Sequence, residues 1–340
     1  MQTIFFKNKP RMIATGSIAG PKECEGVVGR YVDKTLLDDM FGESTYEKAE
    51  CKMLTYAISK TIENAGMDEK QVDMLISGDL LNQIISASFA ARDFDFPFLG
   101  VYGACSTLAE SYALAATLVD GGYAKKVVAA TGSHFSSAER QYRYPLELGN
   151  TRPPQAQWTV TGAGGAFIAD MGSVNDGQNY PAITCATIGK VVDFGVTDVN
   201  NMGAAMAPAA ADTLLRCYAA ENNPLCDADL IVTGDLGFEG SEILRELMVK
   251  DHPEVGDKLT DCGMLIYDRK VQDVHGGGSG CGCSAVMLSA HFLPMLERGE
   301  IKKMIFMATG AMMSPMTLLQ GEAIPGVAHL LVLESPLAQK

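Results

Sequence analysis

The chain has 340 residues, of which 47% are hydrophobic and 20% charged, and its formal net charge is −14 at pH 7. That length allows two domains or one large duplicated unit. The acidic balance argues against nucleic acid or an anionic membrane surface as the main partner. No apolar run approaches the ~18 residues that span a bilayer, and the N-terminus lacks the pattern of a signal peptide.

The cysteines point to free thiols. Nine of them occur without a secretory signal, which is typical of a reducing compartment. No Cys-x-x-Cys pair is present and the five histidines are scattered, so no metal site is expected.

The first half alternates strand-like and helical patterns. A polar segment, residues 132–158, lies near the end of this half. A loop of this length is usually functional or disordered, and its two Tyr and three Arg favour the functional interpretation. In chain order we expect a strand at 13–18, a loop at 20–29, a helix at 46–65, a strand at 72–76, a short helix at 86–92, a buried strand at 98–102, a helix at 106–119, a strand at 126–131, the long polar segment at 132–158, and a glycine-bearing turn into a strand at 159–170.

Cys105 falls where a predicted strand ends and a predicted helix begins. Unpaired backbone N–H groups and the positive end of a helix dipole both favour a thiolate at such a corner. The position therefore suits a nucleophile. A free cysteine is equally often a small buried apolar residue, and the local pattern does not separate the two readings.

The second half repeats three blocks of the first in the same order. Each copy alternates strands with helices, which predicts mostly parallel sheets covered by helices. We therefore predict two similar α/β halves, residues 1–178 and 179–340, with helices that start at Cys105 and Cys283 near a pseudo-two-fold axis. The paired blocks are 73–80 with 229–236, 103–106 with 281–284, and 125–132 with 302–310.

A duplicated α/β unit with a cysteine at a strand-to-helix corner resembles the thiolase superfamily, which includes the ketoacyl-acyl-carrier-protein synthases. Within that superfamily the chain is similar to a family of stage V sporulation proteins. The resemblance covers nearly the whole chain and is specific in combination. It rests on the stretches 78–83, 102–107, 133–145, 161–166, 202–213, 277–285 and 308–315.

This resemblance implies a thiolase-like fold, with helices sandwiched between mostly parallel or mixed sheets. It implies a protein that binds dipicolinic acid, free or as its calcium chelate, and helps to load it into the developing spore. The expected partners are membrane proteins of the same operon, at the cytoplasmic face of the inner spore membrane. The superfamily usually dimerises through a strand of the first half, so a homodimer is also expected.

A condensing enzyme needs a thiolate, a histidine for the proton, and donors for the developing oxyanion. Cys105 matches the first part. The ketoacyl-synthase branch has a histidine after the strand that corresponds to residues 230–233, where this chain has Gly234-Asp235. His275 is either a displaced counterpart of the thiolase histidine or a polar loop residue. The incomplete set makes Cys105 a vestigial nucleophile and favours binding. A cysteine-dependent acyltransferase that uses coenzyme A thioesters is the alternative, and no other cofactor is expected.

A flat pyridine with two carboxylates needs two groups of donors and apolar faces. The helix start at Cys105 and the glycine-rich stretch 277–284 offer backbone N–H groups, and the latter resembles an anion nest. The predicted ligand-binding residues are Cys105, Ser106, Ser133, His134, Ser136, Arg140, Arg143, Gly278, Ser279, Cys283 and Ser284.

Several of these residues also have a purely structural reading. The glycines could serve only to let two helices cross closely. Arg140 and Arg143 are more often ion-pair partners of nearby glutamates than ligands. Asp79 and Asp235 occur in both copies, which favours caps at strand ends over paired acid catalysts. Asn82 and Gln83 are expected at the mouth of the cavity.

Overall fold

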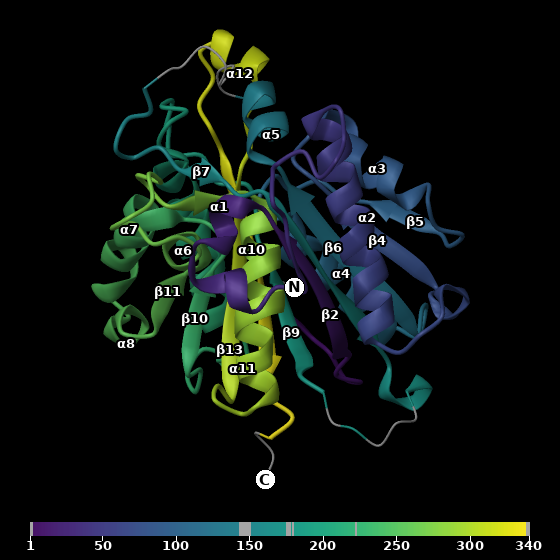
Figure 1. The fold of residues 1–340 in the computed structure, drawn as a ribbon. Coiled ribbons are helices and arrows are strands. Elements are labelled where there is room, and N and C mark those ends of the chain that lie inside the picture. Colours follow the sequence, from purple (N-terminus) through teal and green to yellow (C-terminus); the bar gives the residue numbers. More distant parts are fainter. Residues whose placement is uncertain (1–2, 143–150, 175–177, 179, 222, 338–340) are drawn as a thin grey trace.

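The computed structural model describes residues 3–142, 151–174, 178, 180–221 and 223–337. Its strands form one large mixed sheet and a separate two-stranded sheet, and helices lie on the faces of the large sheet and between its two parts (Figure 1). The first part contains β1 (Thr3–Phe5), β2 (Arg11–Ala19), α1 (Pro21–Cys24), η1 (Val27–Arg30), β3 (Lys34–Thr35), α2 (Tyr46–Asn64), η2 (Glu69–Gln71), β4 (Met74–Gly78), η3 (Asn82–Ile84), α3 (Ile85–Ala91), β5 (Phe98–Gly100), α4 (Thr107–Asp120), β6 (Lys126–Ser133), α5 (Phe135–Tyr142), β7 (Trp158–Thr159), β8 (Gly162–Ala169) and η5 (Met171–Ser173).

The second part continues the alternation of strands and helices. It contains β9 (Ala182–Ile188), α6 (Met202–Tyr218), β10 (Leu230–Thr233), α7 (Gly237–Val249), α8 (Pro253–Gly256), β11 (Leu259–Asp261), α9 (Cys262–Leu265), β12 (Gly278–Ser279), α10 (Cys281–Met287), the π-helical turn η6 (Leu288–Phe292), α11 (Leu293–Glu297), β13 (Lys303–Ala311), α12 (Pro315–Leu319) and β14 (Gly326–Glu334).

Counted inward from either edge, the five strands of each part follow the same order along the chain. The strand order of the large sheet is β11-β10-β13-β14-β9-β2-β8-β6-β4-β5. From each edge the first three strands are parallel, and the next two are antiparallel to their neighbours. The parts join where β2 and β9 pair at Arg11 and Ala182. The prediction of mostly parallel sheets is therefore correct only for the outer strands, and the sheet is mixed.

Two helices occupy the space between the parts. α4 contacts β4, β6 and β8 of the first part and β13 and β14 of the second, whereas α10 packs on β2, β6 and β8. α10 begins at Cys281, two residues before the predicted start. A Cβ atom on Gly164 would lie 2.5 Å from the carbonyl oxygen of Ala285, so α10 crosses β8 at a distance that only glycine permits.

Most predicted elements are confirmed, and three predictions are wrong. Residues 20–29 contain α1 and η1 rather than a loop, because Pro21 fits the first helical position. The strand in 98–102 is β5, which lies at the sheet edge with Leu99 42% exposed and is not buried. The segment 132–158 is not one loop, since β6 runs to Ser133 and α5 follows. Arg143 lies outside the described residues.

Candidate functional site

Cys105 lies in the turn between β5 and α4, as predicted. The turn bonds to itself: the N–H of Gly103 donates to Thr107 Oγ1 at 3.0 Å, and the Ser106 hydroxyl donates to the Gly103 carbonyl at 2.6 Å. Ala104 is forced into the left-handed region, with φ 52°. The Ser106 hydroxyl is thus already hydrogen-bonded within the turn.

The thiol of Cys105 hydrogen-bonds to the carboxylate of Asp235. The other partners of this carboxylate are the Thr309 hydroxyl, which donates at 2.9 Å, and the Gly280 N–H, which donates at 2.8 Å. Asp235 is fully buried, and burial raises its pKa to about 6. A carboxylate thus stands in the position for which the resemblance implied a histidine.

This arrangement favours the protonated thiol of Cys105, whereas its place at a helix start predicts a thiolate. Its side chain is 5% exposed, and burial together with the charge of Asp235 raises the pKa of the thiol well above its ordinary value. A hydrogen bond from the Gly280 N–H opposes the shift but does not cancel it. The expectation of a favoured thiolate is wrong, because burial, together with a nearby carboxylate, outweighs the helix start.

The glycine-rich stretch does bind a carboxylate, but that carboxylate belongs to the chain itself. The N–H of Gly280 points at Asp235, and the N–H of Gly282 donates to Ser133 Oγ at 3.2 Å. Ser133 in turn donates to the Val160 carbonyl at 2.7 Å. Gly278 and Ser279 form β12, which pairs with β7. The Gly280 and Gly282 N–H groups and the Ser133 hydroxyl are therefore already occupied, whereas the buried Ser279 hydroxyl has no hydrogen-bond partner in the described structure.

A narrow pocket opens on Cys105. Its volume is about 30 Å³, close to that of a single water molecule. It adjoins an open groove of about 490 Å³, and Asn82, Tyr102, Met313 and Ser314 line both spaces. Among the described residues, none that lines either space carries a charge. The other residues of the pocket are Leu80, Ala104, Gln141, Tyr142, Met202 and Ala311, and those of the groove are Leu81, Gln83, Ile84, Gly100, Val101, Met312 and Thr317.

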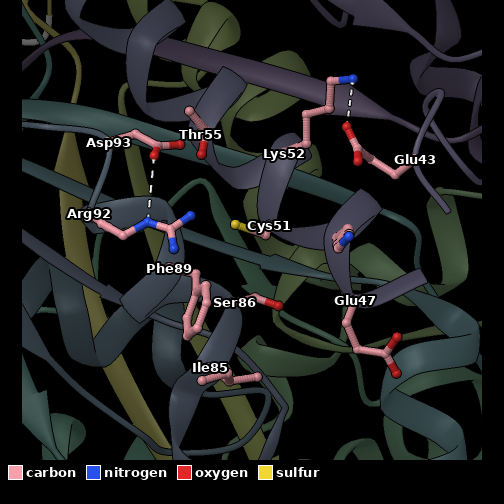
Figure 2. Close-up of a pocket in the computed structure, with 11 residues that line it drawn as sticks. Glu43, Glu47, Cys51, Lys52, Thr55, Ile85, Ser86, Phe89, Arg92 and Asp93 are labelled. Carbon is pink, nitrogen blue, oxygen red and sulfur yellow. Dashed lines mark ion pairs between the residues drawn. The ribbon is translucent and has the colours of Figure 1, made fainter. Parts of the chain in front are cut away.

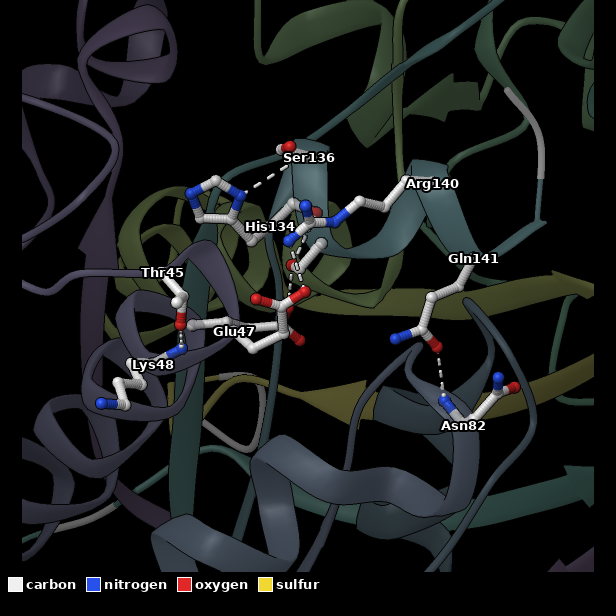
Figure 3. A network of polar contacts seen from close by, with 10 residues as sticks. Thr45, Glu47, Lys48, Asn82, His134, Ser136, Arg140 and Gln141 are labelled. Atoms are coloured by element: carbon white, nitrogen blue, oxygen red, sulfur yellow. Dashed lines mark hydrogen bonds and ion pairs between the residues drawn. The ribbon is translucent and has the colours of Figure 1, made fainter. Parts of the chain in front are cut away.

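α5 closes one side of this pocket. Its Gln141 accepts a hydrogen bond from the N–H of Asn82 at 2.8 Å (Figure 3), and the Tyr142 hydroxyl lies 2.5 Å from Thr159 Oγ1. Sequence reasoning found Asn82 and Gln83 but missed Gln141, Tyr142 and Met202. Their participation depends on how α5 and α6 dock, which no local pattern reveals.

The remaining predicted ligand residues hold α5 in place or pack in the core. Arg140 pairs with Glu47 of α2 at 2.5 Å (Figure 3). Of the glutamates near it in the sequence, Glu147 lies outside the described residues. The ring of His134 accepts the N–H of Ser136 and contacts the carbonyl of Asp39, and burial lowers its pKa to about 4.

Two further predicted residues, Cys283 and Ser284, are fully buried in α10. The sulfur of Cys283 lies 3.3 Å from the position that a Cβ atom on Gly278 would take. Neither side chain lines the pocket at Cys105 or the groove beside it. Cys283 packs beneath β12, whereas the Ser284 hydroxyl lies near Gly234 and has no hydrogen-bond partner in the described structure.

His275 is not brought to Cys105. Its Nδ1 lies 3.0 Å from the Pro153 carbonyl oxygen, and its Nε2 lies 2.8 Å from Asp273 Oδ1. It lines a separate surface cavity of about 330 Å³ together with Arg269 and Gln272. The geometry therefore supports the reading of His275 as a polar loop residue.

A cavity of about 580 Å³ lies between α2 and α3 (Figure 2). Its walls carry both signs of charge, with Lys52 paired to Glu43 at 2.9 Å and Arg92 3.9 Å from Asp93. The Cys51 thiol faces it, and burial raises the pKa of that thiol to about 11. The cavity contains none of the predicted ligand residues and offers no activated nucleophile.

The described residues contain neither a metal-ligand cluster nor a membrane-spanning helix. Within residues 3–337, apart from the gaps stated above, no group of three or more His, Cys, Asp or Glu side chains is placed to hold a metal ion. In the same residues no helix is long and apolar enough to cross a bilayer.

Comparison with known proteins places this geometry in a family. The family model for Stage V sporulation protein AD (SpoVAD) matches residues 1–334. A protein of that name from Bacillus subtilis (strain 168) is 43% identical over 333 residues, which cover 98% of this chain and 96% of the relative.

Solved structures with low sequence identity share the fold. Acetamide-bound OleA of Xanthomonas campestris has a TM-score of 0.60 at 14% identity and covers 97% of this chain and 100% of its own. 3-Oxoacyl-[acyl-carrier-protein] synthase III of Aquifex aeolicus VF5 has a TM-score of 0.55 at 12% identity, covering 96% and 99%. The fold is thiolase-like, and the chain belongs to the Stage V sporulation protein AD family.

Proposed function

We propose that this chain binds dipicolinic acid in the groove beside Cys105 and so helps to load it into the developing spore. Membership of a sporulation family supports the process, and the groove supports the binding. Its volume of about 490 Å³ falls within the range of small-molecule sites, about 300–1,000 Å³. The smaller pocket at Cys105 could hold only one edge of the planar ligand.

The lining of the groove suits a planar acid. In a chain with a net charge of −14, the described lining residues include no carboxylate that would repel an anion. Asn82 and Gln141 bring side-chain amides to the entrance (Figure 3), and Tyr102 brings a hydroxyl and an aromatic face. Neutral donors of this kind can bind carboxylate oxygens, while the ring and the methionines cover the flat faces.

The hydrogen bond between Cys105 and Asp235 carries the argument for binding over catalysis. A condensing enzyme needs a base that takes the thiol proton and returns it. Here the thiol faces a carboxylate that disfavours the thiolate, and no histidine lines the described pocket. The cavity thus retains the shape of a reaction site but holds its sulfur protonated.

Isothermal titration of dipicolinate tests the proposal. Asn82→Ala and Gln141→Ala should each weaken binding about tenfold, since a lost hydrogen bond costs roughly 1–1.5 kcal/mol. Lys48→Ala, in the cavity between α2 and α3, is the matched control and should leave the affinity unchanged. An absence of binding to the wild type, or an equal loss in the control, would contradict the proposal.

The alternative function is a cysteine-dependent acyltransferase. The likeness in fold to the condensing enzymes and the Gly280 N–H beside the sulfur are the observations that favour it. Mass spectrometry after incubation with acetyl or malonyl coenzyme A separates the two. A stable acyl adduct on Cys105 would establish the transferase, whereas thermal stabilisation by dipicolinate without an adduct supports the binder.

We also propose that two copies pair through β5. This strand ends the sheet and has β4 as its neighbour in the described structure, while Phe98 and Leu99 are 36% and 42% exposed. An uncovered edge with apolar side chains is a template for pairing with another strand. Light scattering on Leu99→Arg should then report a monomer and the wild type a dimer. Transfer of the ligand across the membrane would fall to membrane proteins of the same operon.

A further inference from the structure

The groove and the pocket at Cys105 meet at a constriction. The four residues that line both spaces define it: Asn82, Tyr102, Met313 and Ser314. On one side lies about 490 Å³ of open space, and on the other only about 30 Å³. Anything that reaches the thiol from the groove must pass between these four side chains.

Hydrogen bonds fix two of the four residues. The N–H of Asn82 donates to Gln141 Oε1, and Ser314 forms a reciprocal capping box with Thr317 at the start of α12. Within the described residues, no hydrogen bond to the side chain of Tyr102 or Met313 is found. No side-chain hydrogen bond therefore holds this pair in the described structure, and its freedom to move depends on the side chains themselves.

The two side chains of this pair differ in stiffness. Tyr102 presents a rigid planar ring that moves about only two side-chain torsions. Met313 has three rotatable bonds and a polarisable sulfur, and such a side chain readily adapts to irregular space. We propose that Tyr102 and Met313 form a size-selective constriction, in which Tyr102 is the fixed wall and Met313 is the side that yields. The pair then determines which ligands reach Cys105.

This inference concerns the entrance to the site proposed above, but it can be tested without dipicolinate. Methyl methanethiosulfonate is a small thiol reagent and benzyl methanethiosulfonate a bulky planar one. The measurement is the rate at which each modifies Cys105, followed by mass spectrometry of the peptide. The exposed Cys226 provides the internal reference. The ratio of the two rates cancels the pKa of the thiol, because both reagents need the same thiolate.

In the wild type, the preference for the small reagent should be about tenfold greater at Cys105 than at Cys226, the scale of discrimination that a small steric difference produces in a pocket. Met313→Ala should bring the ratio at Cys105 close to that at Cys226. Met316→Ala is the matched control, because Met316 is 63% exposed on the same segment but lines neither space, and it should leave the ratio unchanged.

A second variant keeps the test decisive if Met313→Ala unfolds. Met313→Leu preserves the volume with a stiffer side chain, so the preference for the small reagent should rise. An unchanged ratio in both variants would overturn the inference, and so would a wild-type Cys105 that the small reagent never modifies. A failure to bind dipicolinate would instead remove the proposed function and leave the constriction standing.

Discussion

The two halves place an aspartate at the same point, after β4 and after β10, but use it differently. Asp79 accepts the N–H groups of Leu81 and Ala87 at 2.7 and 2.6 Å, so both of its oxygens hold the backbone that follows it. Asp235 accepts from Gly280, Thr309 and Cys105, which come from other parts of the chain.

A third carboxylate explains the difference. In the second half, Asp261 accepts the N–H groups of Leu236 and Gly237 at 2.8 and 3.0 Å and so fixes the start of α7. Asp235 is thereby released from the capping role that Asp79 performs in the first half. The interpretation of both aspartates as strand-end caps is thus right for Asp79 and wrong for Asp235. The same residue type at matching positions of the two halves therefore performs two different tasks.

The largest expected effect is the loss of stability when the buried carboxyl of Glu23, which has one unpaired oxygen in the described structure, ionises. Glu23 accepts from Tyr267 and from the N–H of Thr161 through Oε1, whereas Oε2 has no hydrogen-bond partner in the described structure. Burial raises its pKa to about 7 from the usual 4.5. The folded state therefore holds this proton more tightly than the unfolded state, and stability falls as pH rises through that window.

The corresponding experiment is urea unfolding at pH 4.5 and pH 8. The wild type should lose about 3 kcal/mol more between these values than Glu23→Gln, since each pKa unit is worth about 1.4 kcal/mol. Glu25→Gln, an exposed neighbour, is the control and should follow the wild type. Equal pH dependence in the wild type and Glu23→Gln would show that the ionised carboxyl finds partners.

The second effect tests Asp79 as a structural cap. Asp79→Ala leaves two buried N–H groups without an acceptor, at about 1–3 kcal/mol each, and removal of a buried charge offsets part of this. We expect a loss of about 2 kcal/mol in the free energy of unfolding at pH 7. Asp68→Ala, which removes an exposed cap of η2, should cost less than about 1 kcal/mol. Equal losses would mean that burial of the cap does not matter.

The third effect concerns the reactivity of the Cys105 thiol, which Asp235 should influence and Asp79 should not. Asp235→Asn removes the negative charge beside Cys105, so the pKa of the thiol should fall and its alkylation by iodoacetamide at pH 8 should accelerate severalfold. Asp79→Asn makes the same change in the other half and should leave the rate at Cys105 unaltered. Peptide mass spectrometry follows the modification. Acceleration in both variants would indicate general loosening.

Much of the fold could be predicted from sequence because it depends on local periodicity and repetition. The helical spacing of 46–65 became α2, the corner at Cys105 became the turn before α4, and two of the three repeated block pairs contain strands at matching positions in the sheet, β4 with β10 and β6 with β13. The strand at 98–102 was mistaken for a buried one because an apolar run does not distinguish a central strand from an edge strand.

The site was harder to predict because it depends on which donors remain unoccupied after folding. The glycine-rich stretch has the composition of an anion nest, yet Asp235 fills it from a distance of 45 residues along the chain. The pKa of Cys105 is raised by burial and by the same Asp235, both of which depend on tertiary packing. Sequence could locate the thiol, but the sign of its electrostatic environment followed only from the tertiary structure.

The smallest expected effect concerns His275, the residue that sequence offered as a displaced base. The structure pairs it with Pro153 and Asp273 on the rim of another cavity. His275→Ala should therefore change the alkylation rate of Cys105 by less than about twofold, while a residue that acted on the thiol proton would change it by about tenfold or more. The pH profile of alkylation should keep its midpoint in this variant and shift downward in Asp235→Asn. A midpoint displaced by His275→Ala would mean that the histidine reaches the sulfur in solution, and Asp235 would then share control of the thiol.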